Sequence, residues 1–326
     1  MYLCALFPSL LFNPFIIMRK TTLLAAVLVL GLLFVSCEKG DQYTPKNRID
    51  RICYSESTTF QEYVNNEWTD IHTNNTPKYV SEIWDWDGKK LKSINHYNEK
   101  GELEYTENFE YNGKRLVSVS GSKWVAGRWI ISYEKGNVSS IDGYVGTEKR
   151  FSYVFSHDNG KVTKIAVTNF DAKKADANPL PINIFRFFIP NPNIQSMKEM
   201  MASIQSYSDT KEIESYDINF EWTGNNISKM TVLKGATTIK TVNYTYDEKT
   251  NPFFGLFDFS EYNESQMMSE NNITREVTES SMHEERDYTY TYEEDLPTTQ
   301  TSSYIWSSDE NTRILFIGNH TYDYKK

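Results

Sequence analysis

Hydrophobic and polar residues alternate along much of the chain. Between residues 216 and 222, Ile218, Phe220 and Trp222 fall on one face, and acidic or amide residues fall on the other. Segments 243–246 and 288–292 alternate in the same way, with tyrosines on one face. A period of two with one polar face predicts antiparallel strands that are wetted on one side. A flat sheet would expose its whole aromatic face, so we expect the sheet to curl.

A nine-residue pattern recurs along these strands. The first copy covers residues 86–94 and has an aromatic residue, a turn with glycine, and aliphatic residues five and eight positions after the aromatic one. Further copies begin at residues 111, 133, 157 and 222, and weaker copies begin at Tyr246 and Tyr292. A spacing of about 24 residues fits two strands and two turns per unit. Because the two aliphatic positions have opposite parity, we expect a β-bulge or a bend after each turn.

Two segments depart from the alternation. The first, at about 171–215, is rich in proline and then has methionine and isoleucine at helical spacing, which predicts an amphipathic helix over about 194–206. The second predicts a short helix at about 260–270. The predicted fold class is therefore mainly β: an antiparallel meander of repeated hairpins of about 24 residues, curled into a roll-like, barrel-like or sandwich sheet, with one or two short helices.

The first 36 residues resemble a secretory signal. Arg19 and Lys20 form a cationic start, residues 23–35 are almost wholly apolar, and Cys37 follows the small residue Ser36. A cysteine at this point is typical of bacterial lipoprotein signals, in which it is acylated and becomes the mature N-terminus. The alternative is a transmembrane anchor, but the apolar run is shorter than the ~20 residues that span a bilayer.

This interpretation divides the chain into three parts. Residues 1–36 are the signal peptide, within which 1–17 are an upstream extension and Met18 is the expected start. Residues 37–48 are the lipidated cysteine and a polar tether. Residues 49–326 form a single repeat-built β domain with an insertion at about 171–215. The expected location is the cell envelope, as an outer membrane lipoprotein whose periplasmic or surface-exposed orientation is left open.

Composition limits the range of partners. The chain of 326 residues has a net charge of −10, which becomes −12 without residues 1–36, since they contain two cations and no acid. An acidic domain does not neutralise phosphates, so a nucleic-acid partner is excluded. Three cysteines do not make a disulfide scaffold. In the mature chain Cys53 accompanies only Cys37, and we expect it to be a small buried hydrophobic residue rather than a nucleophile.

The chain resembles uncharacterised envelope lipoproteins of Bacteroides-type bacteria. The resemblance lies in the cysteine signal, the hairpin repeats, and the segments 246–253, 270–274 and 290–297. It covers roughly residues 80–300. The repeats are also similar to the YD repeats of Rhs-type shell proteins, although most copies lack the Tyr-Asp pair. The resemblance implies a β fold and an envelope location, and it implies no catalytic mechanism.

Motifs for catalysis are absent from the sequence. It has no Gly-x-Ser-x-Gly, Gly-x-Gly-x-x-Gly or phosphate-loop motif, and its five histidines show no metal-ligand spacing. Segment 283–286 begins like a zinc-protease helix but lacks the second histidine, and segment 85–88 is expected to be a hairpin turn rather than a calcium loop. We therefore predict no enzyme, no catalytic residue, no metal and no cofactor. A two-carboxylate hydrolase needs a pair of acids, but nothing in the sequence singles out a pair such as Glu107 with Glu110 or Glu284 with Glu285, and we expect such acids to be solvated on a polar strand face.

Tryptophans are the candidate recognition residues, because flat aromatic faces suit sugar stacking. The candidates for ligand binding are Trp84, Trp86, Trp124 and Trp129, of which Trp124 and Trp129 flank a connecting loop and are expected to be exposed. The favoured function is a non-enzymatic, envelope-anchored lipoprotein that binds a glycan, a peptide or a partner protein. The alternatives are a structural or assembly lipoprotein with no small ligand, and a glycan-active hydrolase that uses two carboxylates.

Overall fold

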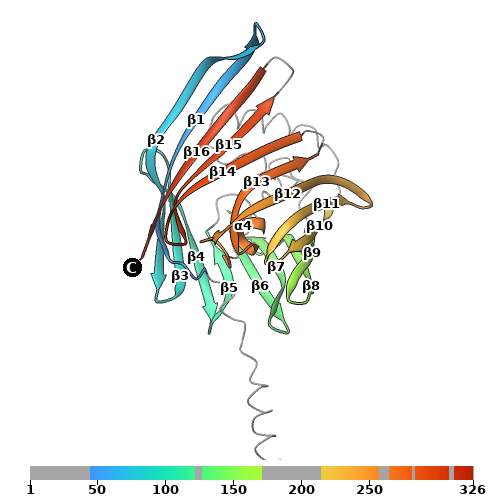
Figure 1. Cartoon of the computed structure of the whole chain (residues 1–326). Coiled ribbons are helices and arrows are strands. Elements are labelled where there is room, and N and C mark those ends of the chain that lie inside the picture. The colour runs from blue at the N-terminus through green and yellow to red at the C-terminus, as the bar shows by residue number, and fades with distance from the viewer. Residues whose placement is uncertain are drawn as a thin grey trace, which may run out of the picture. The chain divides into compact units, whose positions relative to one another are not determined.

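A computed structural model describes residues 45–121, 127–170, 214–256, 264–280, 283–307 and 312–325. These residues form a closed antiparallel barrel in which each strand pairs with its neighbours along the chain and the first strand pairs with the last (Figure 1). The mainly β, barrel-like meander is thus confirmed. The strands are β1 (Ile49–Val64), β2 (Glu67–Asp87), β3 (Lys90–Tyr97), β4 (Leu103–Asn112), β5 (Arg115–Ser120), β6 (Arg128–Glu134), β7 (Asn137–Val145), β8 (Glu148–Asp158), β9 (Lys161–Asn169), β10 (Glu214–Thr223), β11 (Asn226–Lys234), β12 (Thr237–Thr250), β13 (Asn271–Glu279), β14 (His283–Glu293), β15 (Leu296–Ser307) and β16 (Thr312–Tyr324).

One short helix, α4 (Glu264–Met268), lies between β12 and β13 and corresponds to the second predicted helix. The predicted helix over 194–206 and nearly all of the predicted insertion lie outside the described residues, as do Cys37 and the signal segment. Cys53 is a free, half-buried thiol on β1.

The bulge predicted from the repeat occurs in every copy. In the first, Asp85 pairs with Ser93 but Trp86 pairs with Leu91, so Lys92 is an extra residue on β3. The same shift follows the turns β4–β5, β6–β7, β8–β9, β10–β11 and β14–β15. A bulge changes which face the following residues occupy. As a result Leu91 and Ile94, despite their opposite parity, are both fully buried.

Neighbouring hairpins are joined by a hydrogen bond at several of the aromatic repeat positions. The indole or phenol of the aromatic residue donates to the main-chain carbonyl of the aliphatic residue that follows the preceding turn. These bonds are Tyr133 Oη to Leu116 O (2.6 Å), Trp222 Nε1 to Val162 O (2.7 Å), Tyr246 Oη to Ile227 O (2.7 Å) and Tyr324 Oη to Pro297 O (2.9 Å). Tyr324, on the last strand, thus makes the same contact as the aromatic residues of the repeat. At the other end, Trp86 donates to Ile49 O at 2.7 Å.

Cations reinforce the same contact between hairpins. The basic residue after a turn lies over the aromatic ring of the next hairpin: Lys90 over Tyr111 at 5.5 Å, Arg115 over Tyr133 at 5.5 Å, and Lys161 over Trp222 at 5.4 Å. Cation–π contacts at exposed sites contribute about 0.5–1 kcal/mol each. We call this end of the barrel, with its tight repeat turns and both ends of the described chain, the repeat end.

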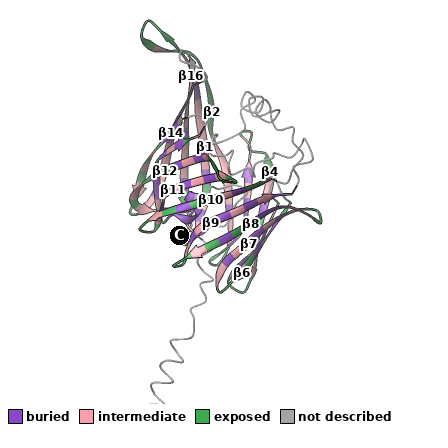
Figure 2. Ribbon diagram, turned by 90° about the vertical axis from the view of Figure 1, so that its right-hand side faces the viewer, coloured by how far each residue is buried: buried purple, intermediate pink, exposed green. Residues whose placement is uncertain are grey.

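Apolar side chains point inward around the whole barrel. Along β10, Tyr216, Ile218 and Phe220 are buried, and the residues between them are exposed or half-buried. Figure 2 shows the same alternation of buried and exposed residues on other strands. The inward residues form one hydrophobic core that includes strands from all sides of the barrel.

Replacing Tyr133 with Phe should test the hydrogen bond between hairpins. The change removes one hydroxyl and leaves the Leu116 carbonyl without its 2.6 Å donor, so we expect a loss of about 1 kcal/mol in the free energy of unfolding. Urea titration measures it, and Tyr63→Phe, at a partly exposed tyrosine, is the control. Equal stabilities of the two variants would contradict a structural role for this bond.

Gly143 makes room for the ring of Trp129. A Cβ atom at position 143 would lie 2.6 Å from Trp129 Cζ3, so Gly143→Ala must displace a buried indole. We expect a loss of about 1–3 kcal/mol in the free energy of unfolding. At Gly127 the nearest atom to a new Cβ would be 3.9 Å away, so Gly127→Ala should leave the denaturant midpoint nearly unchanged. A harmless Gly143→Ala change would mean that Trp129 does not pack on this glycine.

A candidate ligand cavity inside the barrel

The segment between β12 and β13 turns into the barrel interior. Phe253 is buried, and its ring centroid lies 6.2 Å from that of Trp84 on β2 and 6.0 Å from that of Tyr322 on β16. Met267 of α4 is also fully buried. A barrel of sixteen strands is wider than inward side chains alone can fill. Here residues 251–256 and α4 supply the additional apolar volume.

Asn251 fixes the shape of this segment. Its side-chain amide donates to Gln266 O at 2.6 Å and to Ser269 O at 2.8 Å, and its Oδ1 accepts from Phe253 N at 2.9 Å. One buried side chain thereby joins the start of the segment to its end. Asparagine suits this position because it carries both donors and an acceptor.

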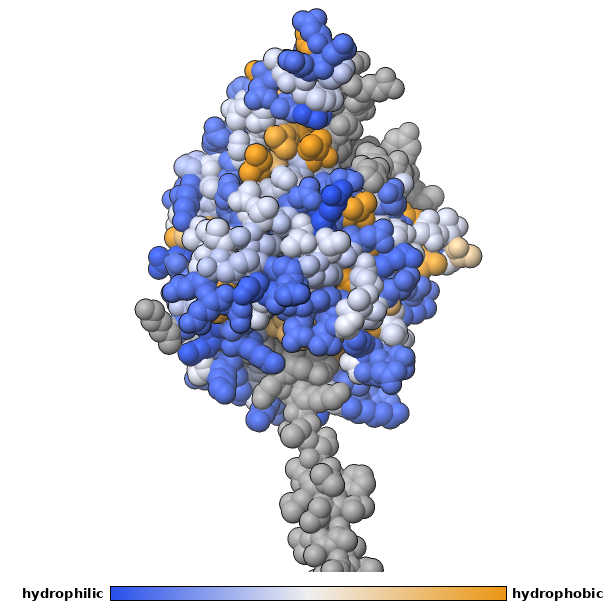
Figure 3. Space-filling view, viewed as in Figure 1, coloured by the Kyte–Doolittle hydropathy of each residue, from blue (hydrophilic) through white to orange (hydrophobic). Residues whose placement is uncertain are grey.

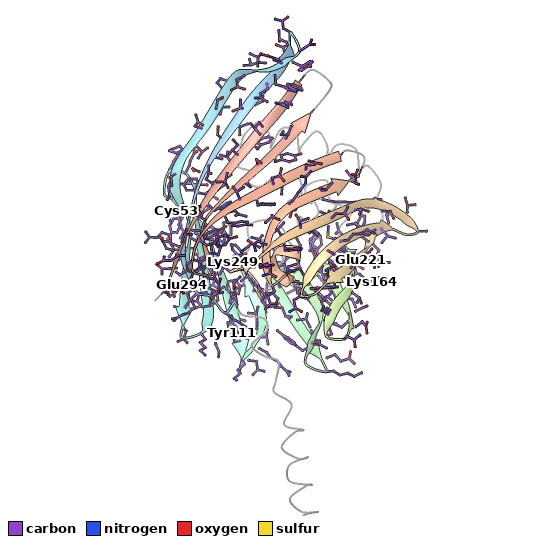
Figure 4. All side chains as sticks on the ribbon, in the orientation of Figure 1. Cys53, Tyr111, Lys164, Glu221, Lys249 and Glu294 are labelled. Carbon is purple, nitrogen blue, oxygen red and sulfur yellow. The ribbon has the colours of Figure 1, made fainter. Side chains whose placement is uncertain are left out.

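The residues just before Asn251 attach the segment to the barrel wall. Asp247 accepts from Lys249 N at 2.9 Å and from Asn272 N at 3.2 Å, and it also accepts from Tyr292 Oη. Lys249 Nζ donates to Asp295 at 2.7 Å and to Glu294 O at 3.3 Å; Lys249 and Glu294 are labelled in Figure 4. The motif at 246–253 therefore has a folding role.

A cavity of about 50 Å³ lies between this segment and strands β13–β16. Since one water needs roughly 10–15 Å³ on this scale, the cavity holds a few waters or one small molecule. Its lining combines aromatic, amide and carboxylate side chains: Asn251, Pro252, Phe253, Gln266, Asn272, Ile273, Glu276, Tyr288, Tyr290, Pro297, Gln300 and Tyr322.

A chain of hydrogen bonds runs along one wall of the cavity. Tyr322 Oη donates to Gln300 Oε1 at 2.7 Å, Gln300 Nε2 donates to Tyr290 Oη at 3.1 Å, and Tyr290 Oη donates to Ile273 O at 2.7 Å. Burial raises the pKa of Tyr290 and of Tyr322 well above the usual value. Both phenols therefore keep their protons at neutral pH and act as donors.

Glu276 is the only carboxylate among the described residues that line the cavity. The residue is 4 % exposed. Oε2 accepts from Tyr288 Oη at 3.1 Å and lies 3.5 Å from Arg286 Nη1, whereas Oε1 has no hydrogen-bond partner among the described residues. Burial, and next the Glu276 carboxylate, raise the pKa of Tyr288, so its hydroxyl stays a donor. Glu276 is therefore a buried carboxylate that is only partly satisfied by the described residues.

The predicted tryptophans contribute little to an exposed site. Trp84 is fully buried and Trp129 is 3 % exposed, so the expectation that Trp129 is exposed is wrong. Its ring fits on Gly143 instead, which the sequence pattern did not indicate. Trp86 is half-buried at the repeat end and donates to Ile49 O. Trp124 lies outside the described residues, and its role stays a prediction.

The acid pairs noted in the sequence are not brought together. Glu107 is fully buried and lies 3.2 Å from Nε2 of His96, whereas Glu110 is exposed. Glu284 is buried and Glu285 is exposed, as expected for neighbours on a strand, since β14 is not a helix. Segment 85–88 ends in the predicted hairpin turn.

Within the described ranges, no group of three or more His, Cys, Asp or Glu side chains is placed to hold a metal ion. In the same ranges no helix has the length and apolar character needed to cross a membrane. The cavity residues Glu276, Gln300 and Tyr322 were missed by sequence reasoning. The alternating tyrosines at 288–292 were the one part of this lining that the sequence pattern indicated. Glu276 was missed because the sequence does not distinguish an inward-facing glutamate from any other glutamate on a strand.

No family model matches the chain, and no curated protein matches it in sequence. A similar solved structure is a porin-like protein from Bacteroides uniformis, with a TM-score of 0.47 and 11 % identity, covering 87 % of this chain and 100 % of the other. Another is a porin-like protein from Bacteroides vulgatus, with a TM-score of 0.42 and 8 % identity, covering 86 % of this chain and 99 % of the other.

His320 should make stability depend on pH. Its ring stacks on Tyr322 and lies 4.8 Å from the ring of Tyr54, and burial lowers its pKa from 6.5 to about 4. The unfolded chain then binds a proton between pH 6.5 and 4 that the folded chain does not bind, so stability falls as the pH falls through this window.

The measurement is the free energy of unfolding from pH 7 to pH 4. The wild type should lose on the order of 3 kcal/mol more than His320→Gln over this range, because each pH unit contributes about 1.4 kcal/mol. The control is His72→Gln, at an exposed histidine, and should keep the wild-type slope. Parallel curves for the wild type and His320→Gln would show that His320 is not buried as a neutral ring.

Proposed function

We propose that the protein is a lipid-anchored envelope protein whose barrel works in water as a non-enzymatic binding module for a glycan, a peptide or a partner protein. The lipid is attached at Cys37 and holds the domain at the outer membrane. The observation that carries this proposal is the polarity of the barrel wall, which is apolar inside and charged outside.

Ion pairs are spread over the outer face of the strands. They join β9 to β10 (Lys164–Asp217, 2.9 Å), β10 to β11 (Glu221–Lys229, 2.8 Å), β13 to β14 (Arg275–Glu285, 2.6 Å), β2 to β3 (Asp85–Lys92, 3.0 Å) and β7 to β8 (Asp142–Lys149, 2.6 Å). Figure 4 labels Lys164 and Glu221 on this face. A Lys or Arg that faces lipid costs about 2–4 kcal/mol at the bilayer midplane. This arrangement favours a wall that faces water.

The surface itself supports the same view. In Figure 3 the visible face is mostly hydrophilic, and its hydrophobic residues form separate small patches. Exposed large apolar side chains such as Ile71, Leu103 and Val154 belong to different strands. This surface supports the role that we assign to the lipid on Cys37, which is to keep the barrel at the membrane.

The side chains inside the barrel argue against the alternative functions, which are transport of an apolar cargo and glycan hydrolysis. Core side chains and the segment at 251–256 take up part of the barrel interior, which favours binding elsewhere over a wide channel or an apolar cargo. A two-carboxylate hydrolase needs a second acid near the first, and the described cavity lining holds Glu276 alone. Binding at the outer surface or at the loops is what this architecture supports best, and Trp124 stays a candidate for it.

The test replaces Cys37 with Ser in cells. We expect palmitate labelling to be lost and, when a signal that is cleaved independently of Cys37 replaces residues 1–36, the protein to move from the membrane fraction to the soluble fraction. Cys53→Ser is the matched control and should change neither labelling nor fractionation. Unchanged labelling would contradict lipidation at Cys37. Lost labelling with full retention in carbonate-washed membranes would contradict a barrel that faces water.

A further inference from the structure

We propose that residues 67–76 of β2 bind an extended, cationic segment of a partner protein by adding it to the barrel wall as a further strand. The inference rests on the proposed binding function and names its surface and its kind of partner. Three observations about residues 67–76 carry it: an open strand edge, an exposed isoleucine on that edge, and carboxylates that are not paired with a cation.

The part of β2 that follows its turn with β1 has a strand on one side only. Residues 67–76 pair with residues 56–64 of β1, whereas β3 pairs with β2 only from Glu82 onward. Figure 1 shows the β1–β2 hairpin rising beyond β3 and β4. Among the described strands none pairs with the second edge of residues 67–76, so this edge presents main-chain N–H and C=O groups to a partner.

This edge is already extended before a partner binds. Its neighbour β1 is paired on the other side with β16 as far as Glu62, and residues 67 and 69–75 are exposed. Pro77 has no N–H to donate, so it ends the stretch that a partner can pair with continuously. A preformed edge loses little conformational freedom on binding, and main-chain hydrogen bonds to such an edge are an established mode of peptide recognition.

Ile71 provides an apolar contact on the edge. It is 63 % exposed, more than any other large hydrophobic side chain among the described residues. It is the extra residue of a bulge, because Asp70 pairs with Gln61 and His72 pairs with Phe60. An exposed hydrophobic residue on an open edge strand favours association. A partner strand with an apolar side chain beside Ile71 would remove both from water.

The charges of the hairpin favour a cationic partner. Between residues 52 and 77 the chain has no lysine or arginine, but it has four acids: Glu56, Glu62, Glu67 and Asp70. No ion pair among the described residues includes Glu67 or Asp70, and Asp70 accepts from Gln61 Nε2 at 2.6 Å instead. Glu67 and Asp70 lie on the open strand itself, so lysine or arginine on an added strand would form ion pairs with them.

Nearby cations leave these carboxylates available. Arg313 of β16 reaches the same hairpin, but its Nε donates to Gln61 at 2.6 Å and its guanidinium lies 4.1 Å from the centre of the Trp68 ring. Lys78 follows Pro77 and lies outside the open stretch. The net charge of −10 on the whole chain also attracts a cationic segment.

A second copy of the chain is a poorer occupant than a partner peptide. Two identical edges related by a two-fold axis pair antiparallel, which directs the repeat ends of the two barrels in opposite directions. Because β1 begins at the repeat end, copies anchored through Cys37 in one membrane would have their repeat ends on the same side. They are not arranged to pair in this way.

The experiment measures the binding of synthetic peptides to the purified full chain in detergent by fluorescence anisotropy. The probe is a peptide of about ten residues, a usual strand length, in which lysine alternates with valine and threonine. One control has glutamate for each lysine, and another keeps the lysines but has N-methyl groups on consecutive main-chain nitrogens, which blocks both of its edges. We expect saturable binding of the lysine peptide alone. No binding of it, or equal binding of the N-methylated peptide, would overturn the proposal.

Hydrogen exchange locates the bound peptide. The lysine peptide should slow exchange in residues 67–76 about tenfold or more, and it should leave β10, which is paired on both sides, unchanged. Protection only elsewhere, or full protection of residues 67–76 without peptide, would contradict the assignment. A peptide-free dimer by light scattering, with these amides protected, would show that a second copy occupies the edge.

A double variant tests the choice of a cationic partner. Glu67→Gln with Asp70→Asn should weaken binding of the lysine peptide about threefold or more, because two ion pairs are lost. Asp287→Asn is the matched control, since it removes an exposed charge from β14, which is paired on both sides, and it should bind as the wild type does. Unchanged affinity in the folded double variant would overturn the role of the carboxylates. The peptide controls on the wild type decide the matter if the double variant does not fold, and all these readouts are independent of the Cys37 test.

Discussion

The hydrogen bond from a repeat aromatic residue to the neighbouring hairpin, made at Trp86, Tyr133, Trp222 and Tyr246, is the interaction on which the barrel depends. Tyr133 and Trp222 reach carbonyls next to β-bulges, where the regular ladder is interrupted. The bulge and the aromatic donor therefore belong together, because the first disrupts the ladder and the second supplies a donor at the same place. Since Tyr324 and Trp86 make the same contact near the two ends of the described chain, the pattern continues to the junction between β1 and β16.

A closed barrel of this width with an apolar inner face encloses more volume than its inward side chains can fill. Small barrels are filled by their own side chains, but a sixteen-stranded barrel is not. This chain solves the problem where the repeat is most degenerate, at Tyr246. There the tight turn is replaced by a longer segment, and Asn251 holds it so that Phe253 and α4 enter the interior. At the degenerate copy in the sequence, the segment that replaces the tight turn thus packs inside the barrel and helps to fill it.

Much of the fold could be predicted from the sequence because the repeat pattern is determined by local features, namely strands, tight turns and bulges. Alternation predicted strands, the glycine turns predicted hairpins, and the opposite parity of Leu91 and Ile94 required the bulge. The number of strands and the closure could not be predicted, since they depend on pairing between residues far apart in the chain. The candidate site was missed for the same reason. Glu276 looks like any strand glutamate until pairing with β14 and the return of Phe253 enclose it.

The two sides of the wall also explain why polar chemistry is found inside. The apolar core at the repeat end satisfies the hydrophobic requirement of the fold, and the inward positions further along β13 and β14 carry Glu276, Arg286 and Tyr288. Buried charges are costly unless they are paired, and here the pairing is incomplete at one oxygen. A barrel stabilised only by packing would gain from an apolar residue at position 276. Tyr288 and Arg286 beside Oε2 are the partners that compensate the cost of burying the Glu276 carboxylate.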